Sequence, residues 1–267
     1  NDMAQGAAEE DGSCWTNDER RTCYVVRHAE SRYNAAVKSL SLRAMMGERD
    51  HGLSEHGRSQ CEALRTLLKE LADSGDGDAI AMLEAPWLSS PLRRALATAA
   101  LVRRGGGTIV ALPDGREHCV APLFARDSEG TPKDHIAVAL ATELGGVEDT
   151  DVDVSNIDGD CWWHVAETAS SVRRRLASLL DELYARSEDR PAVFVGHSRA
   201  LRDMFNHFGL QGGLLSRRCI ANCAVVKVAL RGDCLLGHNN NNNKDALPRG
   251  GGASILEAEL LFGSSYK

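Results

Sequence analysis

The chain has 267 residues, of which 43% are hydrophobic and 26% are charged, and its formal net charge at pH 7 is −7. This composition is ordinary for a globular protein and excludes a disordered chain. No apolar stretch approaches the roughly 18 residues that a membrane-spanning helix needs, so we expect no insertion into a membrane.

Apolar, β-branched runs alternate along the chain with stretches of helical period. The expected strands are TCYVV at 22–26, TIVAL at 108–112, AVFV at 192–195 and AVVKVAL at 224–230. Short strands that alternate with helices are typical of an α/β fold with a mainly parallel sheet covered by helices. In such a sheet the functional residues gather at the carboxyl ends of the strands.

Three helices are predicted between these strands. Ser54 can cap a helix in which the apolar residues from Cys61 to Leu71 recur at steps of three and four. A second helix should begin after Pro91 and end at a run of glycines. The third carries the apolar residues from Val172 to Leu183 and ends before Pro191.

The chain divides into a main domain and two flanking segments. We expect an N-terminal extension at 1–20, the domain at 21–236, and a low-complexity Asn run with a C-terminal segment at 237–267. Residues 143–163 hold seven acidic residues and no Lys or Arg, which we interpret as a solvated acidic loop. Such a loop repels polyanions, so nucleic acid is not an expected partner.

The cysteines point to a reducing compartment. All eight lie outside any C-x-x-C pair, so neither a zinc module nor a disulfide framework is indicated. Several lie within apolar patterns, where a reduced cysteine behaves as a small buried hydrophobic residue. We therefore predict a cytoplasmic location.

The segment CYVVRHAESRYN carries the first chemical signal. An apolar strand leads directly into Arg27 and His28, and the polar residues Glu30, Ser31 and Asn34 provide a strand end. A lone buried histidine often does no more than donate to a carbonyl. A cation beside a histidine at the carboxyl end of a strand, however, is typical of an anion site in an α/β fold.

This segment resembles the R-H-G-E-S-x-x-N signature of the histidine phosphatase superfamily, the phosphoglycerate-mutase-like proteins. Three further blocks resemble the family's motifs in the same order, namely LSEHGRSQ at 53–60, SSPLRRALATA at 89–99 and VFVGHS at 193–198. Together the blocks span 22–208, most of the chain. The resemblance implies a three-layer αβα sandwich with a mainly parallel central sheet.

The resemblance also implies roles for particular residues. His28 would be the nucleophile that accepts the phosphoryl group as a phosphohistidine. The residues implied to hold the phosphoryl oxygens are Arg27, Asn34, Arg94 and His197, the last of which would add charge if protonated. Register with the family block favours Arg94 over Arg93, which we interpret as a solvated helix residue. Fixed cations of this kind substitute for a metal, so no metal and no cofactor are expected.

The proton donor is the position at which the sequence departs from the family. Many members carry a Glu in a context resembling P-L-x-x-E, and the corresponding stretch here is VAPLFARDSEG, with Arg126 at that place. Asp127 or Glu129 must then donate the proton, and we favour Asp127. Ala29 replaces the usual Gly, which is acceptable unless the backbone there needs a positive φ.

A rival interpretation comes from another class of enzyme. VFVGHSRA also resembles the G-x-S-x-G nucleophile elbow of α/β-hydrolases, with Ser198 as nucleophile, although Ala200 stands where that motif has Gly. The acids and histidines available downstream are Asp203, Asp233, Asp245, His207 and His238. This interpretation leaves RHAESRYN unexplained.

Within the family the sequence favours a phosphatase over a phosphomutase. Tyr33 stands where mutases typically carry Trp, and the long charged insertion that mutases have after the second arginine block is missing. A catalytically weak member that binds a phosphorylated ligand stays open as an alternative. The substrate would be a small phosphorylated metabolite or a phosphoprotein. The segment at about 105–165, which would set specificity, matches no interpretable pattern.

Overall fold

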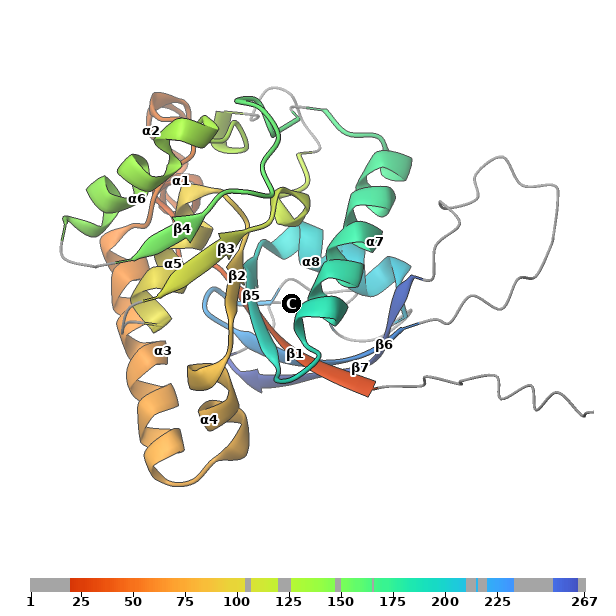
Figure 1. Cartoon of the computed structure of the whole chain (residues 1–267). Helices are drawn as coiled ribbons and strands as arrows, with labels where there is room; N and C mark the ends of the chain where they lie inside the picture. Colours follow the sequence, from red (N-terminus) through yellow and green to blue (C-terminus); the bar gives the residue numbers. More distant parts are fainter. Residues whose placement is uncertain are drawn as a thin grey trace, which may run out of the picture.

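The computed structural model describes residues 20–103, 107–119, 126–146, 150–164, 166–209, 215, 220–232 and 252–263. Seven strands in this part of the chain form one sheet in the order β4-β3-β2-β5-β1-β6-β7 (Figure 1). The strands are β1 (Arg20–Arg27), β2 (Trp87–Ser89), β3 (Thr108–Ala111), β4 (Asp151–Asp153), β5 (Ala192–Gly196), β6 (Val225–Gly232) and β7 (Ala253–Phe262). The helices are α1 (Arg32–Lys38), α2 (Leu42–Gly47), α3 (Glu55–Asp73), α4 (Gly77–Glu84), α5 (Arg93–Arg103), α6 (Ile136–Leu144), α7 (Ala169–Arg186) and α8 (Ser198–His207), with short 3₁₀ turns η1 (Pro113–Gly115) and η3 (Lys133–His135).

The sheet is mainly parallel, as the sequence predicted. From β4 through β3, β2 and β5 to β1, all neighbouring strands run in the same direction. β6 and β7 continue the sheet in antiparallel fashion beyond β1. The four strands expected from the sequence are confirmed as β1, β3, β5 and β6.

Both faces of the sheet are covered by helices, which confirms the three-layer αβα architecture (Figure 1). Side chains alternate between the faces of a strand. In β1, Tyr24 and Val26 therefore pack into a core with α3, α4, α5 and α6, whereas Cys23 and Val25 face α7 and α8. All four are buried, as expected for a strand of a parallel sheet with helices on both sides.

The three predicted helices are confirmed as α3, α5 and α7. Ser54 caps α3 because its Oγ accepts the backbone N–H of Gly57 at 3.0 Å. Gly57 is needed where the helix approaches the segment that follows β1, since a Cβ there would lie 2.0 Å from the backbone oxygen of Glu30.

The acidic segment at 143–163 is not solvated throughout. Glu143 is 7% exposed and lies 2.9 Å from Arg58 and 3.3 Å from Arg32, and it accepts the backbone N–H of Leu53 at 3.0 Å. Its charge therefore stabilises the junction between the start of α3 and the end of α6, which corrects our interpretation for this residue. The other acidic residues described in the segment are exposed or half-buried.

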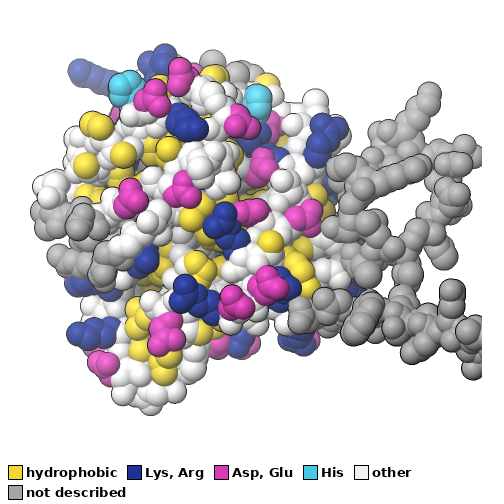
Figure 2. Space-filling model, viewed as in Figure 1, with side chains coloured by type: hydrophobic (Ala, Val, Ile, Leu, Met, Phe, Trp, Pro, Cys, Tyr) yellow, Lys and Arg dark blue, Asp and Glu magenta, His cyan; other side chains and the backbone are white. Residues whose placement is uncertain are grey.

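The sheet continues past residue 236, where we expected the domain to end, because β7 pairs with β6. The first nineteen residues, the Asn run and residues 104–106, which include two of the three glycines after α5, lie outside the described residues. None of the helices in the described ranges is long and apolar enough to span a bilayer. Figure 2 shows basic and acidic side chains interspersed over one face of the molecule.

Candidate active site

The carboxyl ends of the parallel strands bring distant parts of the sequence together. His28 follows β1, Ser90 follows β2 and His197 follows β5. The rings of His28 and His197 have centroids 5.0 Å apart and are tilted by 56°. The two histidines of the sequence motifs are thus neighbours at one edge of the sheet.

A cavity of about 700 Å³ opens at this edge. Its lining includes the predicted residues Arg27, His28, Asn34, Arg94 and Asp127. His197 does not line the cavity; it is fully buried and packs against His28. Glu129 does not line it either and forms an ion pair with Arg49, with Nε and Oε2 3.0 Å apart.

The surroundings of His28 favour a neutral imidazole in which one ring nitrogen forms a hydrogen bond and the other keeps its lone pair. Its Nδ1 lies 2.6 Å from the carbonyl oxygen of Ala29, which only accepts, so the ring proton belongs on Nδ1. Burial, and then the charges of Arg94 and Arg27, lower the pKa of His28 well below its usual value. A hydrogen bond to a carbonyl is also typical of a histidine with a purely structural role. Here, however, the ring lines the cavity, and the lone pair of Nε2 is available there.

Backbone contacts fix the turn that carries His28. The N–H of His28 donates to Gly196 at 3.0 Å, and Asn222 donates to the carbonyl of His28 at 2.8 Å. The N–H of Ala29 donates to Thr98 Oγ1 at 3.0 Å. Ala29 is not among the residues with positive φ, so the fold does not need glycine at this position.

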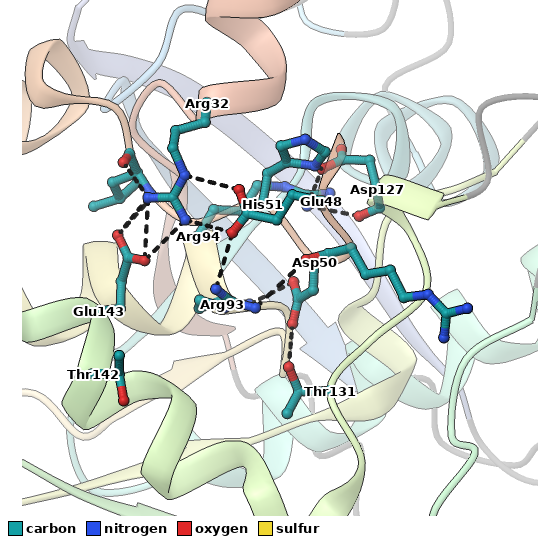
Figure 3. A network of polar contacts seen from close by, with 12 residues as sticks. Arg32, Glu48, Asp50, His51, Arg93, Arg94, Asp127, Thr131, Thr142 and Glu143 are labelled. Carbon is teal, nitrogen blue, oxygen red and sulfur yellow. Dashed lines mark hydrogen bonds and ion pairs between the residues drawn. The ribbon is translucent and has the colours of Figure 1, made fainter. Parts of the chain in front are cut away.

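The two consecutive arginines of α5 point to different partners (Figure 3). Arg94 is 2% exposed, lines the cavity and donates from Nη1 to the backbone oxygen of Asp127 at 3.0 Å. Arg93 is not simply solvated, since its Nη1 lies 3.1 Å from Glu48. Arg27 also lines the cavity, and its Nη1 donates to the carbonyl of Ile220 at 2.5 Å.

The surroundings of His197 favour its neutral form over the cation. Burial, and then the charge of Arg94, lower the pKa of His197 well below its usual value. Its Nε2 lies 2.8 Å from Ser90 Oγ, and its buried Nδ1 has no partner among the described residues. The positive charge of the site therefore comes from arginine.

A carboxyl group that the sequence analysis missed also lines the cavity. Glu117 follows η1, a few residues after β3, and its Oε1 accepts the backbone N–H groups of His118 at 2.9 Å and Ala200 at 3.0 Å. A polar residue soon after the end of a predicted strand was the available signal. The resemblance to P-L-x-x-E directed attention to a later stretch instead.

A buried ion cluster holds the backbone that leads to Glu117. Arg175 donates to the carbonyls of Asp114 at 2.8 Å and Arg116 at 3.0 Å. Glu167 joins Arg175 to Arg116, with a shortest contact of 2.6 Å to Arg116 Nη2. Because these partners are buried, the turn before Glu117 is fixed in place.

The contacts of Ser198 do not resemble those of a serine hydrolase. Ser198 begins α8 and lines the cavity, but its buried Oγ has no hydrogen-bond partner in the described part of the chain. His207 lies at the opposite end of α8. Asp203 is paired with His118, whose Nδ1 lies 2.7 Å from its Oδ2. The remaining proposed partners, Asp233, Asp245 and His238, lie outside the described residues. The described ranges contain no group of three or more His, Cys, Asp or Glu side chains that could hold a metal ion.

A family model described as "Histidine phosphatase superfamily (branch 1)" matches residues 23–242. Among solved structures, "Mycobacterial hydrolase 1" is 21% identical with a TM-score of 0.49, covering 93% of this chain and 100% of that one. A mycobacterial glucosyl-3-phosphoglycerate phosphatase is 22% identical with a TM-score of 0.44, covering 79% and 93%. A phosphoserine phosphatase from Entamoeba histolytica is 16% identical with a TM-score of 0.47, covering 89% and 95%. No curated protein matches the chain.

Proposed function

Because the chain belongs to branch 1 of the histidine phosphatase superfamily, we propose that it hydrolyses phosphate monoesters through a phosphoryl group carried by His28. The observation that supports this most is the state of His28 itself. Its pKa is lowered and its proton is held on Nδ1 by Ala29, so the Nε2 lone pair is available at neutral pH. A neutral imidazole in a cavity with two arginines is suited to attack a phosphoryl group.

Donors around His28 would hold the three phosphoryl oxygens. Arg27 and Arg94 supply positive charge, which is worth more in a buried site than in water. The side-chain oxygen of Asn34 accepts the N–H of Ser31, which leaves its NH₂ group as a donor. These fixed donors would stabilise the negative charge of the phosphoryl oxygens, as a metal ion does in other phosphatases. Metal independence stays a prediction.

We propose Glu117, rather than Asp127, as the proton donor. Nη1 of Arg94 and Nδ1 of His51 both lie within hydrogen-bond distance of Oδ1 of Asp127. Both contacts engage the same carboxyl oxygen, so Asp127 is tied to Arg94 and His51. Among the described residues, Glu117 accepts backbone N–H groups through Oε1, and Oε2 is the oxygen that we propose carries the proton. Asp127 then serves to hold Arg94 at the phosphoryl site.

The two half-reactions balance with these residues. In the first, Nε2 of His28 forms a bond to phosphorus, the ester P–O bond breaks, and the leaving oxygen takes the proton of Glu117. In the second, the Glu117 carboxylate takes a proton from water, the water oxygen bonds to phosphorus, and the P–Nε2 bond breaks. Inorganic phosphate leaves, and both residues return to their starting states.

The size of the cavity favours a small substrate. A volume of about 700 Å³ lies in the range that holds a small ligand, so we propose a phosphorylated metabolite rather than a folded phosphoprotein. We propose that the phosphoryl group is transferred to water rather than to a sugar acid, because Tyr33 stands at the sequence position where mutases typically carry Trp. Tyr33 also lines the cavity. A cytoplasmic location remains a prediction.

Trapping the intermediate tests the proposal. The protein is mixed with a ³²P-labelled phosphate monoester, quenched in alkali and digested, and the labelled peptide is identified. We expect the label on the peptide that contains His28, and we expect His28→Ala to lower kcat by at least about 10³-fold. His207→Ala, at the far end of α8, is the matched histidine control and should keep full activity. Label on another residue, or near-normal turnover by His28→Ala, would contradict the proposal.

A further inference from the structure

A series of buried, hydrogen-bonded side chains links the cavity to α2 (Figure 3). Nη1 of Arg94 lies 3.2 Å from Oδ1 of Asp127, and Nδ1 of His51 lies 3.0 Å from the same oxygen. Nε2 of His51 lies 3.2 Å from the carbonyl oxygen of Ala44. His51 is 1% exposed, so these two oxygens are the partners that its ring nitrogens have.

The hydrogen bonds of His51 and Asp127 require one proton more than a neutral imidazole and a carboxylate carry between them. The carbonyl of Ala44 only accepts, so Nε2 of His51 carries a proton. The contact between Nδ1 and Asp127 then needs a second proton, either on Nδ1 or on the carboxyl group. Arg94 donates to the same oxygen of Asp127, which favours the carboxylate and assigns the proton to His51.

The charges of the three groups add up to a single positive charge beside the phosphoryl site. A bare carboxylate at Asp127 would cancel the guanidinium of Arg94. We propose that His51 is a positioning residue whose imidazolium offsets Asp127, so that the charge of Arg94 acts on the phosphoryl group. This inference deepens the proposed function and rests on it, because it takes Arg94 to be a phosphoryl ligand.

The other groups that face His51 do not supply this charge. The ring of Tyr33, from α1, meets the His51 ring edge-on with centroids 5.4 Å apart. The carboxylate of Glu48 also faces His51, but Arg32 at 2.6 Å and Arg93 at 3.1 Å neutralise it. Asp127 is thus the acid that His51 is placed to balance.

Binding of sulfate provides the test, because sulfate resembles the phosphoryl group and keeps its two charges at every working pH. Its affinity is measured by calorimetry at pH 7.5 for the wild type, His51→Gln, Asp127→Asn and the double variant. Gln keeps one N–H toward Asp127 but carries no charge, so His51→Gln should weaken sulfate binding about tenfold. Asp127→Asn removes the negative charge that His51 balances, so this variant should bind sulfate at least as tightly as the wild type does.

The double variant separates an electrostatic role from a structural one. His51→Gln with Asp127→Asn leaves the guanidinium of Arg94 uncompensated again, so we expect wild-type affinity to return. A double variant as weak as His51→Gln, or a His51→Gln protein that binds normally, would overturn the inference. The buried carboxyl of Asp50, whose pKa burial raises to about 6, is common to all four proteins at one pH and does not affect the comparison.

Two further measurements keep the outcomes distinct. Arg94→Gln should abolish sulfate binding, and a wild type that binds no sulfate, or an Arg94→Gln protein that binds it normally, would contradict the proposed phosphoryl site itself. If His51→Gln does not fold, ¹⁵N NMR of the wild type reports on His51 directly. Protons on both ring nitrogens at pH 7 are expected, and a neutral ring would overturn the inference.

Discussion

Glu117 and Asp127 line the same cavity but differ in their surroundings, and the leaving group of the substrate can tell their roles apart. An alkoxide needs a proton in the transition state, a contribution of typically 10²–10⁴-fold, whereas p-nitrophenolate leaves without one. Glu117→Gln should therefore lower kcat/KM strongly for an alkyl phosphate and only slightly for p-nitrophenyl phosphate. Steady-state kinetics on the two substrates check this.

Variants at the two alternative carboxyl groups serve as controls. Asp127→Asn should affect both substrates to a similar extent, because it acts on Arg94 rather than on the leaving group. Glu129→Gln should behave as the wild type, since Glu129 pairs with Arg49 away from the cavity. If Asp127→Asn shows the strong dependence on leaving group and Glu117→Gln does not, Asp127 is the donor, as the sequence predicted.

Residues in ordered motifs could be predicted from the sequence, whereas residues that depend on loop paths could not. His28 and Arg94 lie where a strand or helix begins or ends, and the structure brings both to the cavity. Glu117 comes after a 3₁₀ turn whose course is set by Arg175 and Glu167, which lie far along the chain. The contact of His51 with Asp127 likewise joins two loops, and no local pattern encodes such a contact.

At the scale of elements, Gly57 permits α3 to approach the segment that follows β1. Gly57→Ala would force the Cβ against the backbone oxygen of Glu30, which cannot rotate away. We expect the free energy of unfolding to fall by about 1–3 kcal/mol, as for other overpacked sites. Gly77→Ala, at the start of α4, is the matched control because its Cβ would meet nothing within 4 Å. Urea unfolding curves of both variants check this, and equal stability of the two would contradict it.

Length and periodicity explain which elements the sequence could predict. α3 and α7 have long apolar stripes, and α3 also has a capping serine, so both follow from local pattern. β2 and β4 have three residues each, too few to show a period of two. They are strands because β3 and its neighbours offer hydrogen-bond partners, and those partners come from elsewhere in the chain.

At the scale of the whole molecule, the two buried histidines of the candidate site make stability depend on pH. The pKa values of both His28 and His197 are lowered in the folded state, so below about pH 6.5 the unfolded chain binds protons that the folded chain does not. Stability should therefore fall as the pH drops below 6.5. Asp50 opposes this in part, because its raised pKa makes the folded chain take up a proton near pH 6.

Thermal unfolding at pH 7.5 and 5.5 measures the effect. We expect a lower Tm at pH 5.5, and a smaller difference in a variant with His28→Gln and His197→Gln, which removes both groups. An unchanged Tm between the two pH values would contradict the assignment of both histidines as buried and neutral.

The strands that flank β1 in the sheet are synthesised long after β1 itself. β1 is made before the other described strands, yet its two neighbours are β5, which begins at Ala192, and β6, which begins at Val225. At a synthesis rate of roughly 5–20 residues per second, β1 waits on the order of ten seconds or more for either partner. The apolar segment Cys23–Val26 has no sheet partner during that interval, and the turn that carries His28 is completed only after Gly196 and Asn222 have been made.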